Sequence, residues 1–98
     1  MDILVIKNTD NVGTALNKIV QNESGTFLID NEHIAITARE EIPFGFKIAL
    51  ADIKQGDPIY KYGEIIGLAS REILKGEQVH IHNCEGVRGR GDIVRSHV

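Results

Sequence analysis

The chain has 98 residues, of which 42% are hydrophobic, 26% are charged and 5% are aromatic, with a net charge of −3. This length fits one domain, and the balance of apolar and charged residues is typical of a folded soluble protein. Because aromatic residues are scarce, the core must consist mostly of Ile, Val, Leu and Ala, which favours β structure. The absence of a basic surplus argues against nucleic-acid binding.

The N-terminus and the single cysteine indicate the cellular compartment. The apolar run Ile3–Ile6 has no basic region before it and is too short for a signal peptide. No stretch approaches the roughly 20 apolar residues of a membrane span. Cys84 has no partner for an internal disulfide and no base near it in the sequence, so we expect a buried or inert thiol. We therefore predict a cytoplasmic protein without membrane contact.

The N-terminal segment predicts one strand and one helix. Ile3–Ile6 is a short β-branched run, typical of a strand. Thr9, Asp10 and Asn11 are each able to cap a helix. Apolar residues then follow at helical spacing, namely Val12, Ala15, Leu16, Ile19 and Val20. This one-sided stripe predicts a short amphipathic helix over about residues 11–21.

The pattern changes to a period of two after the predicted helix. Residues 26–30 and 33–38 are strand-like and are separated by polar residues that predict a hairpin turn. In the second strand we expect Ile34, Ile36 and Ala38 to face the core, because alternate side chains point to opposite faces of a strand.

A pattern of Ile-x-x-Gly-x-x-apolar occurs three times, at residues 42–48, 53–59 and 73–79. Each copy predicts a buried isoleucine, a turn whose glycine takes a positive φ, and entry into a new strand. Gly63 separates two further strand-like runs and predicts a tight hairpin. Together these features predict a compact β unit.

The C-terminal segment differs in composition. Residues 85–92 hold three glycines and two arginines in eight positions. Such a segment buries little apolar area, so it is either a frayed tail or an arm that orders on a partner. We therefore divide the chain into a domain over residues 1–84 and a tail over residues 85–98. The guanidinium groups of Arg88 and Arg90 are candidates for binding an acidic partner surface.

His80 and His82 lie two residues apart at the end of a predicted strand. They would project from one face while Val79 and Ile81 point into the core. Two aligned imidazoles suit a divalent metal or an acid/base pair near neutral pH. A bare pair is more often a solvated strand face, and a metal needs a third ligand that the neighbouring sequence does not offer.

Two lysines are further candidates. Lys61 lies between Tyr60 and Tyr62 just before a glycine, and Lys47 follows the glycine of a predicted turn. Either lysine could pair with a substrate carboxylate, and Tyr62 could donate a hydrogen bond. The alternative is that the tyrosines pack and the lysines are solvated. These patterns alone indicate a small, mostly β domain with a candidate histidine pair, and they do not indicate a reaction.

Four segments together resemble one family. Residues 10–12, 42–50, 61–67 and 76–83, in this order and spacing, are similar to the N-terminal SAF-like domain of the altronate/galactarate dehydratase family. The resemblance covers about residues 8–92. One position departs from the pattern, because Phe46 stands where the family usually has histidine.

The resemblance implies a β-clip-like SAF fold, which with the predicted helix gives a mostly β, α+β class. It implies a separate small subunit of a hydro-lyase that is completed by a large catalytic subunit. The enzyme would remove water from a small hydroxy acid to give a 2-keto-3-deoxy acid, using a divalent metal, Fe²⁺ or Mn²⁺. We expect catalytic or metal-binding roles for His80 and His82, carboxylate binding by Lys61, Tyr62 and Lys47, and partner binding by Arg88 and Arg90.

Two other functions fit the same residues. The small subunit of sulfolactate sulfo-lyase is similar in sequence but serves an enzyme that expels sulfite. A free-standing SAF-like module would bind a sugar acid or a partner protein without catalysis.

Overall fold

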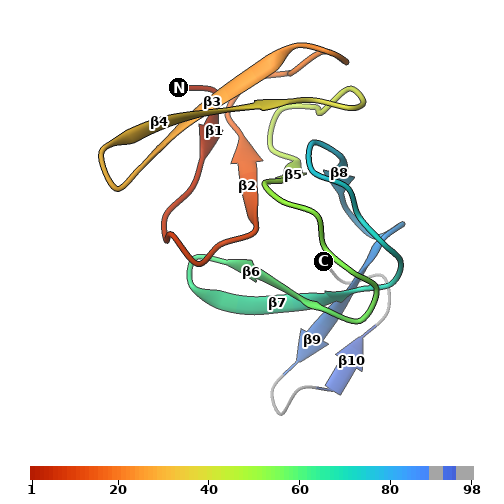
Figure 1. The fold of residues 1–98 in the computed structure, drawn as a ribbon. Helices are drawn as coiled ribbons and strands as arrows, with labels where there is room; N and C mark the ends of the chain where they lie inside the picture. The colour runs from red at the N-terminus through yellow and green to blue at the C-terminus, as the bar shows by residue number, and fades with distance from the viewer. Residues whose placement is uncertain (89–91, 95–98) are drawn as a thin grey trace.

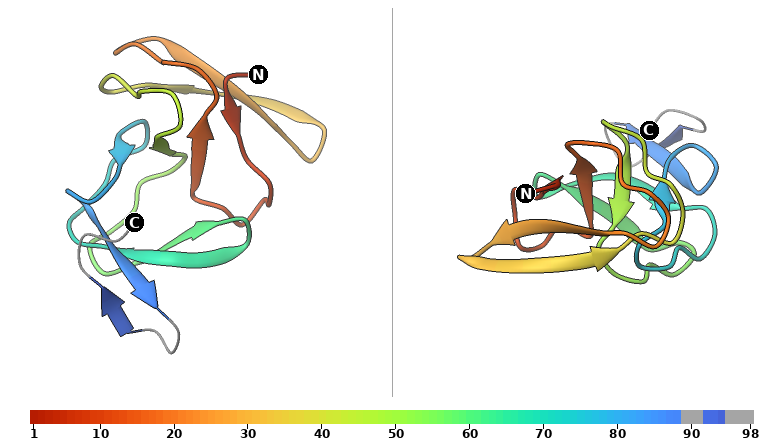
Figure 2. Two further views of the ribbon diagram at one scale, coloured as in Figure 1. Left: turned by 180° about the vertical axis from the view of Figure 1, so that it is seen from behind. Right: turned by 90° about the horizontal axis from the view of Figure 1, so that it is seen from above.

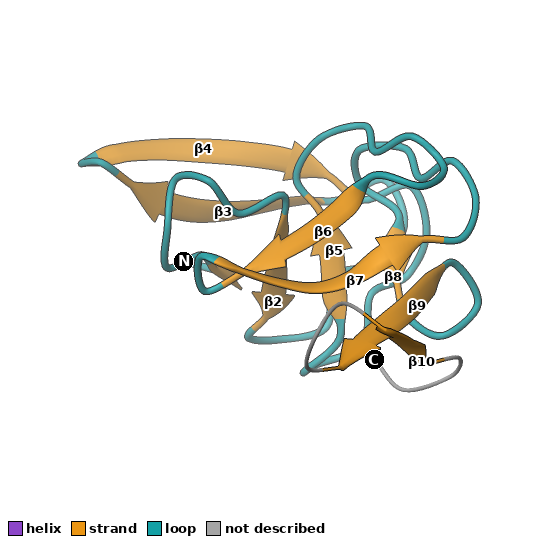
Figure 3. Ribbon diagram, turned by 90° about the horizontal axis from the view of Figure 1, so that it is seen from below, coloured by secondary structure: helices purple, strands orange, loops and turns teal. Residues whose placement is uncertain are grey.

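The computed structural model describes residues 1–88 and 92–94, and the strands account for all of the regular secondary structure in them (Figures 1 and 3). The ten strands are β1 Ile3–Leu4, β2 Val12–Ala15, β3 Ser24–Ile29, β4 Glu32–Thr37, β5 Lys47–Ala49, β6 Pro58–Lys61, β7 Glu64–Ala69, β8 Gln78–Val79, β9 Cys84–Arg88 and β10 Asp92–Val94.

The strands form three antiparallel sheets. The first has the order β1-β2-β5-β8, the second has the order β10-β9-β7-β6, and β3 pairs only with β4. In Figure 1 the β3–β4 hairpin and the β6–β7 hairpin lie on opposite sides of the first sheet, and the left view of Figure 2 shows the same arrangement from behind. The first sheet is therefore the middle layer of the fold.

The predicted helix over residues 11–21 is wrong. Residues 12–15 form β2, which pairs with β1 on one side and with β5 on the other. Ile19 then makes an isolated antiparallel bridge to Ile42. The two strands that flank β2 satisfy its backbone groups on both sides, and this pairing overrides the helical spacing of the apolar residues. That spacing does not match burial either, because Leu16 and Val20 are exposed.

The hairpin predicted after residue 25 is confirmed as β3 and β4. Its turn residues Asp30 and Asn31 have φ values of 50° and 63°, as in the type I′ turn that matches the twist of a two-stranded hairpin. Ile36 and Ala38 are buried and Ile34 packs against the same core. The predicted inward face of this strand is therefore correct.

The threefold Ile-x-x-Gly-x-x-apolar pattern is confirmed in every copy. The isoleucines that open the copies and the apolar residues that close them are all buried, namely Ile42, Ile48, Ile53, Ile59, Ile73 and Val79. The three glycines have φ values of 84°, 87° and 91°. The predicted hairpin at Gly63 is also present, as β6 and β7.

Each face of the first sheet covers a separate core. Ile3, Ala15 and Ile48 belong to the core beneath the β3–β4 hairpin. Val12, Ala49 and Val79 belong to the core shared with the second sheet. Side chains that alternate along β2 and β5 thus divide between the two cores, and this fixes which residues can reach the second sheet.

Part of the C-terminal segment takes part in the second sheet, because β9 pairs with β7 and with β10. The structure does not describe the side chain of Arg88. It also does not describe residues 89–91, which include Arg90, or residues 95–98. The assignment of Arg88 and Arg90 to partner binding and the boundary at residue 84 therefore stay predictions. In the described residues, no helix is long and apolar enough to span a membrane.

Candidate active site

The chain turns at His80 instead of continuing as a strand. β8 ends at Val79, and residues 80–83 form a turn. Asn83 closes this turn, because its Oδ1 accepts a hydrogen bond from the His80 backbone N–H at 2.9 Å and its Nδ2 donates to the Gln78 carbonyl at 2.8 Å. Asn83 is itself buried. A buried amide with both of its polar atoms paired holds the His80 turn in one conformation.

The turn separates the two histidines from the strand geometry that we predicted. Ile81 is 51% exposed and does not point into the core, so the predicted alternation fails after Val79. His82 is exposed and His80 is half-buried. The physical reason is that a turn breaks the two-residue alternation of a strand.

His80 packs against Phe46, with ring centroids 4.9 Å apart and an interplanar angle of 47°. Burial lowers the pKa of His80, and the positive charges of Lys47 and then His82 lower it further. The imidazole is therefore neutral near pH 7 and is able to accept a proton. Phe46, the one departure from the family pattern, lies directly against this ring.

Lys47 is the most unusual residue of the site, because it is only 9% exposed. It lies in β5 between Thr14 of β2 and Val79 of β8. Burial lowers its pKa, and so does the charge of Lys61, whereas Cys84 acts in the opposite direction. No carboxylate of the described residues contributes to that pKa. The side chain is largely buried and its charge gains no acidic partner among the described residues, an arrangement that an anionic ligand would complete.

Two further groups belong to the core on the Lys47 side. Cys84 is fully buried, as predicted, and burial raises the pKa of its thiol to about 11 although Lys47 opposes this shift. The Thr14 hydroxyl is buried and has no hydrogen-bond partner among the described residues. Sequence analysis missed Thr14 because it placed this residue in a helix, where it would not face Lys47.

Lys61 and Tyr62 lie at the β6–β7 turn. The Lys61 Nζ lies 4.9 Å from the centroid of the Tyr62 ring, within the range of a cation–π contact. Tyr62 has a φ of 58°. The carboxylate of Asp10 supports this strained turn by accepting the backbone N–H groups of Tyr62 at 3.0 Å and Gly63 at 2.8 Å. Asp10 therefore stabilises a turn and not the helix that we predicted.

The described residues do not fit a metal site. They contain no group of three or more His, Cys, Asp and Glu side chains able to hold an ion. In addition, the charge of Lys47 acts on His80 and would repel a cation there. A lysine whose charge acts on this imidazole suits a carboxylate better than a metal. The assignment of metal binding to His80 and His82 stays a prediction that needs ligands from another chain.

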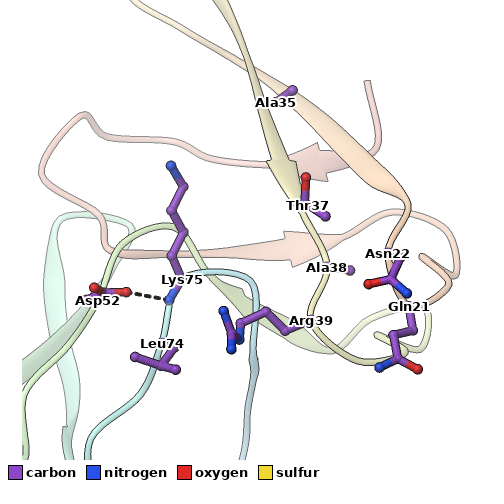
Figure 4. A pocket seen from close by; sticks show the side chains of 9 residues that line it. All are labelled: Gln21, Asn22, Ala35, Thr37, Ala38, Arg39, Asp52, Leu74 and Lys75. Carbon is purple, nitrogen blue, oxygen red and sulfur yellow. Dashed lines mark hydrogen bonds between the residues drawn. The ribbon is translucent and has the colours of Figure 1, made fainter.

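Two cavities of the described surface lie away from Lys47 and His80. The larger of the two, of about 680 Å³, lies between the end of β4 and the loop that carries Leu74 and Lys75 (Figure 4). There the Asp52 carboxylate accepts the Lys75 backbone N–H at 2.8 Å. A smaller cavity of about 220 Å³ includes His82 and Asn83. Neither of these two cavities includes Lys47 or His80.

Sequence comparison adds the family. The family described as "Altronate/galactarate dehydratase SAF domain" matches residues 1–86. The chain belongs to this family. This SAF domain is 41% identical to altronate dehydratase of Bacillus subtilis (strain 168) over 80 residues, which are 82% of the chain but 15% of that protein. The chain thus spans a small part of the altronate dehydratase that it matches.

Shorter relatives match the SAF domain over most of their own length. It is 42% identical to (2R)-sulfolactate sulfo-lyase subunit alpha of Paracoccus pantotrophus over 59 residues, which are 60% of this chain and 88% of that subunit. The same subunit of Chromohalobacter salexigens is 29% identical over 91 residues, which are 97% of its length. Members of the family therefore occur both as a part of large lyases and as a small separate subunit.

Proposed function

We propose that this SAF domain is the small subunit of a hydro-lyase of the altronate dehydratase type, and that it holds the carboxylate of a small hydroxy acid. The observation that carries the proposal is Lys47, a largely buried lysine whose charge acts on His80 and which gains no acidic partner among the described residues. Lys61 adds a second positive charge on the same side, since its charge acts on Lys47. The partner would be a large catalytic subunit.

The proposed reaction uses these groups in a fixed order. Lys47 pairs with the substrate carboxylate, which favours the negative charge that develops next to it when the α-proton is removed. The neutral imidazole of His80 accepts that proton. The hydroxyl at the next carbon leaves as water with the proton that His80 has taken up, which returns the imidazole to its neutral form. The resulting enol tautomerises to a 2-keto-3-deoxy acid.

A divalent metal, Fe²⁺ or Mn²⁺, would stabilise the departing hydroxide. Because the described residues of this chain do not fit a metal, we assign its ligands to the large subunit.

A second candidate is the alpha subunit of a sulfolactate sulfo-lyase. It is favoured by the relatives of this name, which the chain covers over 88% and 97% of their length. Here the sulfonate would leave as sulfite in place of hydroxide, and the two cations would suit the substrate equally. A binding module without catalysis is the third possibility.

The test begins with purification of the chain from its native host under anaerobic conditions with Fe²⁺ or Mn²⁺ supplied. We expect a partner of several hundred residues that, together with this chain, converts altronate or galactarate to a 2-keto-3-deoxy acid. Release of sulfite from sulfolactate would support the second candidate instead. Full activity of the partner alone would overturn the role of this chain in the site.

The contribution of Lys47 is tested by Lys47→Met, which keeps the length of the side chain and removes the charge. We expect kcat/KM of the reconstituted enzyme to fall about 10- to 100-fold, the range of a lost hydrogen bond to a charged group. Lys54→Met is the matched control, because Lys54 is exposed in the next repeat. Equal activities of the two variants would remove Lys47 from the site.

A further inference from the structure

Three chain segments meet at one end of the first sheet. Register places Thr14 opposite Lys47 and Lys47 opposite Val79, so the end of β2, the start of β5 and the end of β8 lie side by side. The Ala15 N–H donates to the Phe46 carbonyl and the Gly45 N–H donates to the Ala15 carbonyl, both at 2.8 Å. These contacts extend the sheet as far as the turns that follow.

This end of the sheet exposes large apolar side chains. Phe44 is 71% exposed, Ile81 is 51% exposed and Leu16 is 38% exposed. We call these three residues the apolar end. Two of them lie on turns that hydrogen bonds hold in place, since the Phe46 N–H donates to the Pro43 carbonyl and the Asn83 N–H donates to the His80 carbonyl, both at 3.1 Å. Large apolar side chains that stay exposed at one end of a sheet are typical of a binding surface.

The apolar end is continuous with the candidate site. Phe44 lies two residues before Phe46, and Ile81 directly follows His80. The rings of Phe46 and His80 are in contact. Lys47, the first residue of β5, directly follows Phe46 in the chain. A partner that covered the apolar end would also cover the half-buried His80 and exclude water from it, which strengthens the electrostatic interactions of the site.

We propose that the apolar end docks in an apolar groove of the large catalytic subunit, with Phe44 and Ile81 as the main anchors. This inference rests on the proposed function. A second copy of this chain is a poorer occupant, because self-pairing at this end would bring the Lys47 sites of both copies face to face and close the site against substrate. The large subunit, in contrast, must reach His80 and Lys47 to complete the site.

The test uses the purified large subunit from the reconstitution experiment and measures its binding to this chain by calorimetry without substrate. We expect the double variant Phe44→Ser/Ile81→Ser to bind at least 100-fold more weakly. The matched control is Leu28→Ser/Ile65→Ser, since these side chains are 41% and 48% exposed but lie on β3 and β7. The control should change the Kd by less than threefold, and circular dichroism should show that both variants are folded.

Different results would overturn the proposed docking surface and the proposed function. Unchanged binding of Phe44→Ser/Ile81→Ser overturns the docking surface, even when the complex is active. An intact, Phe44-dependent complex without turnover of any of the three acids overturns the function but supports the surface. Dimers of this chain alone in sedimentation velocity, dissociated by Phe44→Ser, would assign the surface to a second copy and overturn the proposal.

Discussion

At the residue scale, the candidate site depends on one buried cation and one neutral imidazole. Lys47 is held between its neighbours in β2 and β8, where its ammonium gains no acidic partner among the described residues. His80 is held by the side chain of Asn83 and by the ring of Phe46. Both groups therefore have lowered pKa values for the same main reason, which is desolvation.

The pH dependence of catalysis tests His80. Its pKa is lowered from 6.5, and a base must be neutral, so kcat/KM should be constant near pH 7 and should fall as the pH drops through that lowered pKa. His80→Ala should reduce the rate roughly 100-fold and abolish this acid limb. The rate of His82→Ala is measured in the same experiment, because a catalytic histidine pair requires a similar loss of rate in that variant. An acid limb that persists in His80→Ala would exclude His80 as the base.

The stability of Lys47→Met tests the cost of burying this amine. The folded-state pKa of Lys47 lies below 10.5, so the unfolded chain binds the proton more tightly. The penalty is complete below the folded-state pKa and disappears as the pH rises toward 10.5. Lys47→Met should therefore raise the free energy of unfolding at pH 7 by about 1 kcal/mol and remove this rise with pH, as measured by urea unfolding. A destabilised Lys47→Met would show that the amine has a partner in the free chain.

At the element scale, the three Ile-x-x-Gly-x-x-apolar corners decide where the strands begin. Their glycines all have positive φ, but their surroundings differ. A Cβ at Gly76 would lie 2.2 Å from the Thr37 carbonyl oxygen, whereas a Cβ at Gly56 would meet nothing within 4 Å. The corner at Gly76 thus also fixes the distance between the β3–β4 hairpin and the loop before β8.

Substitution of these two glycines separates conformational strain from close packing. Gly56→Ala should destabilise the protein by about 1–2 kcal/mol, the cost of a left-handed conformation for a residue with a Cβ. Gly76→Ala should cost at least about 3 kcal/mol, because backbone must also move. Thermal unfolding of both variants measures the difference. Equal losses would mean that the contact at Gly76 relaxes at little cost.

At the scale of the whole molecule, the first sheet carries a core on each face and the candidate site at one end. The cavity between β4 and the Lys75 loop and the cavity beside His82 include neither Lys47 nor His80. Under the proposed function, the large subunit supplies the remaining walls of the site. The docking experiment therefore also tests whether two chains share the site.

The sequence by itself determined the β class, the β3–β4 and β6–β7 hairpins and the three corners, because these depend on local turn chemistry and a two-residue alternation. It also indicated Lys47, Lys61 and His80 as candidates. Only the tertiary structure decided that residues 12–15 form a strand and that Ile81 is exposed. It alone placed Thr14 beside Lys47 and Phe46 against His80. The exposure of Ile81 follows from the turn that the Asn83 side chain holds. The other outcomes have a different physical reason: they depend on pairing and packing between residues more than 30 positions apart, which local spacing does not encode.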